Sequence, residues 1–154
     1  MKKIFIITIL FIVSNSLVTA QEEKIDSLKI NLNKNSINFS YGILSAYLSY
    51  ESLFQGKVFG SRNSAIVDYG LGSFVHWDEE SPFIISRFGI LTGSGHRHFE
   101  AKVGACIFFG GDMQNMLLPS GSIGYRKQKP GSHYIFRTGI GFPDALYVSW
   151  GVSF

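Results

Sequence analysis

Large apolar side chains alternate with small or polar ones over the last nine residues of the chain, 146–154. Successive side chains of a β-strand point to opposite faces, so this period of two predicts a strand. One face carries Leu146, Val148, Trp150, Val152 and Phe154, and the other carries Tyr147, Ser149, Gly151 and Ser153. The pattern predicts a strand with one wholly apolar side and one small, polar side.

Seven more segments of strand length precede it, each bounded by Gly, Pro, Asn, Asp or Ser. The eight predicted strands are Ser36–Gly42, Ser45–Phe54, Ser64–Trp77, Phe83–Thr92, His98–Phe109, Leu117–Lys127, His133–Phe142 and Ala145–Phe154. All but the first are near the ~9–11 residues that a tilted strand needs to cross a bilayer. An even number of strands is also typical of membrane barrels.

The face opposite the apolar one decides between a soluble and a membrane protein. A soluble sheet exposes a face rich in Lys, Glu and Thr. Here that face is rich in Gly and Ser with single charges, as Glu100, Lys102 and Gly104 illustrate. This favours a narrow, crowded interior and an apolar exterior. Since open strand edges cannot be satisfied in lipid, we predict an all-β, eight-stranded antiparallel up-and-down transmembrane β-barrel.

The N-terminus predicts export. Lys2 and Lys3 precede the apolar stretch Ile4–Val13, and Val18–Ala20 ends in small residues typical of a signal-peptide cleavage site. The apolar stretch is shorter than the ~20 residues of a membrane helix. We therefore expect a cleaved signal peptide over residues 1–20, a polar periplasmic lead-in over 21–35 and a barrel over 36–154, placed in the cell outer membrane.

Charge and cysteine content exclude several classes of function. The formal net charge of +3 falls to +1 without Lys2 and Lys3, which leaves no basic patch typical of nucleic-acid binding. Cys106 is the single cysteine, so the chain forms no intramolecular disulfide and no Cys-based zinc site. No run of ~18 apolar residues follows Ala20, which excludes a membrane helix there.

Short motifs in the last third resemble a known family. Ser122–Arg126, a Lys/Pro/Gly turn, Tyr134–Gly139 and a closing aromatic strand resemble small outer-membrane β-barrel proteins of Gram-negative bacteria. Tyr50–Phe54 and His98–Glu100 fit the same pattern. The resemblance implies a fold and a location, with outer-membrane lipids and the barrel-assembly machinery as partners. It implies no activity.

The terminal aromatic residues match this resemblance. Trp150 and Phe154 resemble the C-terminal signature that outer-membrane proteins present to their assembly machinery. We therefore expect these two residues to act as an assembly signal.

Seven charged residues share the inward face of the predicted strands: Glu51, Asp68, Arg87, Glu100, Lys102, Arg126 and Arg137. An eight-stranded barrel is just wide enough for side chains to fill. Hydrogen-bonded ion pairs offset much of the desolvation cost of such charges. We therefore predict an ion-pair core that plugs the lumen, with a proton or small-ion pathway as the alternative.

Other candidate chemistry is weaker. His96 and His98 could hold a metal ion, but they follow a Gly-rich turn, which favours a solvated turn. The acidic run 78–80 favours a solvated loop over a cation site. Ser132 and His133 are adjacent, so on a strand they face opposite sides and cannot pair directly. We expect no enzyme activity, no cofactor and no metal.

The connections predict two rims of opposite charge. Those on the side of the two termini contain the bases Lys57, Arg62, His96, Arg97, Lys127 and Lys129. Those on the other side contain the acids Asp78, Glu79, Glu80, Asp112 and Asp144. The latter connections are short, the longest lying near 110–116, which argues against a binding site built from long loops.

These patterns favour a monomeric barrel with a structural or envelope-maintenance role. The first alternative is an outer-membrane lipid-modifying enzyme whose site lies at the membrane-facing rim. The second is a soluble periplasmic barrel that binds an apolar ligand, as lipocalins do.

Overall fold

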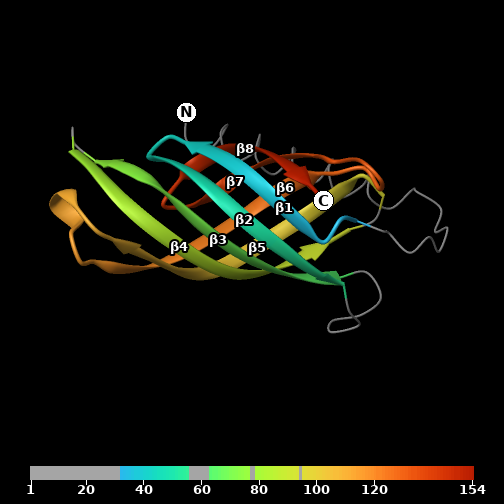
Figure 1. The fold of residues 1–154 in the computed structure, drawn as a ribbon, viewed down its shortest axis with the longest axis horizontal. Coiled ribbons are helices and arrows are strands. Elements are labelled where there is room, and N and C mark those ends of the chain that lie inside the picture. Colours follow the sequence, from blue (N-terminus) through green and yellow to red (C-terminus); the bar gives the residue numbers. More distant parts are fainter. Residues whose placement is uncertain (1–31, 56–62, 77–78, 94) are drawn as a thin grey trace, which may run out of the picture.

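Eight antiparallel strands pair in chain order, and the last closes back on the first. The computed structural model describes residues 32–55, 63–76, 79–93 and 95–154. Its strands are β1 (Asn35–Gly42), β2 (Ser45–Gln55), β3 (Asn63–His76), β4 (Glu79–Thr92), β5 (Arg97–Phe108), β6 (Leu117–Lys127), β7 (Tyr134–Phe142) and β8 (Ala145–Ser153). A short 3₁₀ helix, η1 (Gly111–Met113), lies between β5 and β6. The strands cross the long axis of the barrel obliquely (Figure 1).

The predicted closed, up-and-down barrel is confirmed, and the strand boundaries differ at a few ends. The largest difference is at β4, which begins at Glu79 and not at Phe83. Val75 pairs with Glu80 and His76 pairs with Glu79, so pairing continues almost to the connection between β3 and β4. The predicted solvated loop is therefore wrong for Glu79 and Glu80, which are exposed strand residues.

The two faces of the sheet differ in polarity as the alternation predicts. Every strand turns a large apolar residue outward at 47–68% exposure: Phe39, Leu48, Leu71, Phe88, Val103, Ile123, Ile140 and Trp150. The exposed charged side chains of the described residues lie only at strand ends or in connections: Lys34, Glu79, Glu80, Arg97, Asp112, Lys127 and Lys129. The outer surface between the barrel ends is thus free of charge among these residues.

The barrel has two distinct ends. At the terminal end, the start of β1 meets the end of β8, where Asn35 and Phe154 exchange two backbone hydrogen bonds of 3.2 and 2.9 Å. At the other, distal end lie the connections 43–44, 109–116 and 143–144, together with the end of β3 and the start of β4. Figure 1 shows the loop after β5 at one end and the C-terminus towards the other.

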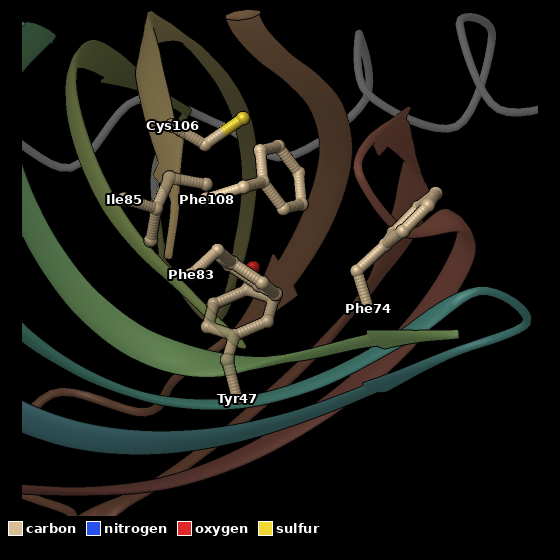
Figure 2. Close-up of a cluster of buried hydrophobic side chains, with 6 residues drawn as sticks. All are labelled: Tyr47, Phe74, Phe83, Ile85, Cys106 and Phe108. Atoms are coloured by element: carbon tan, nitrogen blue, oxygen red, sulfur yellow. The ribbon is translucent and has the colours of Figure 1, made fainter. Parts of the chain in front are cut away.

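Apolar side chains fill the interior near both ends. The distal cluster consists of Tyr47, Phe74, Phe83, Ile85, Cys106 and Phe108, whose side chains gather in the space that the strands enclose (Figure 2). The terminal cluster consists of Leu32, Leu53, Ile66 and Leu91. Phe142, an outward position by simple alternation, also packs partly against the distal cluster, with its ring 6.0 Å from that of Phe74.

Only the end of the predicted lead-in lies within the described residues. Leu32 is buried in the terminal cluster, Asn33 donates a hydrogen bond to the Ser153 carbonyl at 3.2 Å, and Asn35 already belongs to β1. The predicted signal peptide lies outside the described residues. No helix in the described part of the chain is long and apolar enough to cross a membrane.

Candidate functional site: the charged interior

A layer of charge separates the two apolar clusters. On β2, the inward residues run Tyr47, Ser49, Glu51, Leu53, from the distal end to the terminal end. The same order of apolar, charged and apolar side chains holds on β3 and β4. All seven residues of the predicted ion-pair core lie in this layer, each at most 3% exposed: Glu51, Asp68, Arg87, Glu100, Lys102, Arg126 and Arg137.

Like charges stand side by side within each wall of the barrel. Glu51 on β2 pairs in register with Asp68 on β3, and Arg126 on β6 pairs with Arg137 on β7. Like charges directly opposite on neighbouring strands repel. In an eight-stranded barrel, β2 and β3 lie across the lumen from β6 and β7. Closure therefore sets Glu51 against both Arg126 and Arg137. Asp68 forms its ion pairs with Arg87 on the neighbouring strand β4 and with Lys102 on β5.

Glu51 is the centre of this arrangement. Its Oε1 accepts hydrogen bonds from Nη1 of Arg126 and from Nη2 of Arg137, the latter at 2.7 Å. Its Oε2 accepts a hydrogen bond of 3.0 Å from Nζ of Lys102. One carboxylate thus binds three cations from three other strands, and these bonds tie β2 to the far wall of the barrel.

The remaining residues extend the network on either side. Asp68 Oδ2 accepts a 3.0 Å hydrogen bond from Nε of Arg87 and a 3.4 Å bond from Lys102. Glu100 Oε2 lies 3.6 Å from Nε of Arg137, which makes an ion pair with weaker geometry. The structure therefore brings all seven residues into one connected set of ion pairs. Charge-assisted hydrogen bonds of this kind are stronger than neutral ones and hold the strands in a fixed register.

Neutral polar side chains complete the network. The Tyr47 hydroxyl accepts a 2.8 Å hydrogen bond from Arg87, and the Tyr147 hydroxyl donates to Glu100 at 3.3 Å. Gln128 Oε1 accepts from Nε of Arg126 at 2.9 Å. The two tyrosines share the inward parity of the charged residues, so periodicity could have found them. Gln128 lies one residue beyond β6 and keeps the inward parity of Arg126, so the same alternation could have found it.

Asp144 was expected in the acidic distal rim, and this expectation is wrong. It is fully buried in the turn before β8, where its carboxylate accepts hydrogen bonds from Ser45 and, at 3.3 Å, from the Tyr47 hydroxyl. Burial raises the pKa of the Asp144 carboxyl above its usual 3.8, although the Ser45 hydrogen bond acts in the opposite direction. The distal rim therefore draws its described exposed charge from Glu79, Glu80 and Asp112.

The histidines and Ser132 lie differently from their predicted positions. His98 is a buried residue of β5, so the predicted solvated turn holds for His96 but is wrong for His98. Ser132 and His133 precede β7, so the strand argument against their pairing does not apply. Both contact Ser153 instead: its hydroxyl donates to the Ser132 carbonyl at 3.3 Å, and its carbonyl lies 2.8 Å from Nδ1 of His133.

Within the described ranges, no three His, Cys, Asp or Glu side chains form a group that could hold a metal ion. Comparison with known proteins adds no relative: no family model and no curated protein matches this chain. The opposed charges of the interior join the walls of the barrel and fill the space between the two apolar clusters.

Proposed function

We propose that this protein is an integral outer-membrane β-barrel with a sealed, ion-paired interior and a structural role in the cell envelope. Residues 1–20 act as a signal peptide that is removed during export. The barrel is a monomer, its partners are outer-membrane lipids and the barrel-assembly machinery, and the exposed Trp150 and Phe154 serve as the assembly signal.

The observation that carries this proposal is the polarity of the barrel, which is reversed relative to a soluble protein. Buried charges are rare in soluble domains, and large apolar patches are rarely exposed. Here the seven charged side chains of the central layer lie inside, and Asp144 is buried as well, while large apolar side chains lie on the outside of all eight strands. This outer surface is stable in a hydrocarbon environment and would favour aggregation in water.

The filled interior and the short connections support a structural role. Each apolar cluster lies on one side of the charged layer, so a continuous water path would have to displace both. Three of the four distal connections span two residues: 43–44, 77–78 and 143–144. With both termini in the periplasm, these connections face outward, and they are too short to build a loop-based receptor site.

Cell fractionation tests the proposal. The full-length protein, expressed in a Gram-negative host, should stay with outer membranes after a carbonate wash and should migrate as a heat-modifiable folded barrel. Release into the wash would favour a soluble, lipocalin-like protein instead. Mass spectra of lipid A from cells with and without the gene test the enzyme alternative, because an altered acyl pattern would contradict a purely structural role.

A further inference from the structure

Two cations stand side by side on the outer face at the terminal end. Arg97, the first residue of β5, pairs in register with Lys127, the last residue of β6, and both are exposed. Like charges directly opposite on neighbouring strands destabilise a sheet. Inside the barrel, the similar pair Arg126 and Arg137 is matched by Glu51. Among the described residues, no acid forms an ion pair with Arg97 or Lys127.

Apolar side chains continue from this cationic pair towards the middle of the same strands. The next outward pair is Phe99 with Tyr125, followed by Ala101 with Ile123. A groove of about 440 Å³ opens there across β5, β6 and β7. Its outward-facing lining residues are Ala101, Val103, Gly121, Ile123 and Ile140.

Gly121 lines this groove, and packing does not require a glycine there. A Cβ atom added at Gly121 would come no closer than 3.4 Å to any neighbour, an ordinary contact. The inward glycines differ, since a Cβ at Gly104 or Gly139 would approach backbone atoms of the neighbouring strand to 2.0 or 2.3 Å. The sheet would therefore accept a larger residue at position 121, and the groove is a feature of the outer surface that the barrel does not need.

We propose that this surface, the cationic pair with the groove, binds one anionic glycerophospholipid. This inference rests on the proposed membrane location. The lipid phosphate lies between Arg97 and Lys127, where it relieves their repulsion, and one acyl chain crosses Phe99 and Tyr125 into the groove at Gly121. Val103 lies six positions after Arg97, or about 20 Å along a strand. At the ~45° tilt of a membrane strand this is about 14 Å of depth, close to half of the ~30 Å hydrocarbon core.

Native mass spectrometry of the full barrel, released from vesicles, tests the site. The vesicles contain equal amounts of phosphatidylglycerol and phosphatidylcholine with identical acyl chains. A cation near an anionic headgroup favours binding about fivefold, so two should give a preference of about 30-fold for phosphatidylglycerol. Arg97→Gln with Lys127→Gln should abolish that preference. The control pair Lys34→Gln with Lys129→Gln removes two exposed cations from the same end and should preserve it.

A separate substitution tests whether the groove binds an acyl chain. Gly121→Leu should lower the number of bound lipids of both kinds while the headgroup preference remains. Unchanged lipid retention in Gly121→Leu, or a preference that survives loss of both Arg97 and Lys127, would overturn the site. Failure of the wild type to insert into pure phosphatidylcholine vesicles would instead contradict the membrane proposal, and this inference with it.

Discussion

Glu51 shows most clearly how a single residue holds this barrel together. Its carboxylate is 1% exposed and contacts Lys102, Arg126 and Arg137 from β5, β6 and β7. A buried ion pair adds little net stability over apolar packing, but removal of one partner leaves an uncompensated charge. Individual substitutions in this layer should therefore be costly, even though the charged layer as a whole is no stronger than an apolar one.

Arg126→Met provides a direct test at this scale. It keeps an apolar stem but removes one of the three cations that Glu51 binds and the donor to Gln128 Oε1, so we expect a loss of about 3–5 kcal/mol. Lys129→Met removes an exposed base from a connection and should cost less than about 0.5 kcal/mol. The urea midpoint of the folded barrel in detergent measures both. Equal midpoints for the two variants would show that the charge of Arg126 is not needed to balance Glu51.

Asp144 predicts a pH dependence of stability. Because burial raises its pKa above 3.8, the folded barrel holds this proton more tightly than the unfolded chain does. Stability from this group is therefore present below pH ~4 and is lost as the pH rises through the folded-state pKa. Asp144→Asn stays neutral and can still accept the Ser45 hydrogen bond. Its urea midpoint, relative to wild type, should be higher at pH 7 than at pH 4, and a difference independent of pH would contradict this account.

At the scale of the strands, alternation predicts most of the structure. A period of two is enough to identify the eight strands. It also assigns Glu100 and Lys102 to the inside and Val103 to the outside. The assignment is strict because a shift of one residue would move every side chain of the strand to the opposite face.

Alternation fails at the end of β7. Asp144 lies two residues beyond β7 and is buried, although it has the outward parity of that strand. Gln128 and His98 keep the inward parity of β6 and β5 and are buried, so the predicted strand 98–109 was right for His98 and the solvated turn was wrong.

Partners across the lumen could not be predicted in the same way. Alternation places Glu51 and Arg137 inside, but their contact depends on the tilt of the strands and the stagger at closure, which sequence spacing does not reveal. The contact of Glu51 with three cations is therefore visible only in the closed barrel.

Val103→Arg tests which face meets lipid. Val103 lies outward at the middle of β5 and is 68% exposed. A charge near the bilayer midplane costs roughly 2–4 kcal/mol, so this variant should assemble poorly into outer membranes. Tyr134→Arg, outward at the first residue of β7, should cost about 0–1 kcal/mol because it lies near the interface. Heat-modifiable folded protein in washed membranes measures assembly. Normal assembly of Val103→Arg would show that β5 does not face hydrocarbon there.

At the scale of the whole molecule, the barrel has three interior layers and two rims. Apolar clusters lie on both sides of one charged layer, while the described exposed charge is acidic at the distal rim and basic at the terminal rim. Because the two rims carry opposite charge, the electrostatic potential changes sign from one end of the barrel to the other. The distal rim carries Glu79, Glu80 and Asp112, and the terminal rim carries Lys34, Arg97, Lys127 and Lys129.

The layered interior predicts that the barrel conducts little. Wild-type protein in planar bilayers should give no steady single-channel current, whereas an open porin added afterwards to the same bilayer should give one. A large, steady conductance would contradict the plugged lumen and would favour a small pore or an ion pathway through the charged layer.

The central claim is that the apolar outer face meets lipid, and a fluorescent label at Val103 tests it most directly. An environment-sensitive fluorophore is attached to Val103→Cys in a Cys106→Ser background, with Lys129→Cys as the control in a connection. In reconstituted vesicles, lipids brominated on their acyl chains should quench the label at position 103, and aqueous iodide should not. At position 129, iodide should quench the label and brominated lipids should not. Quenching of the label at 103 by iodide, without quenching by brominated lipid, would contradict the account.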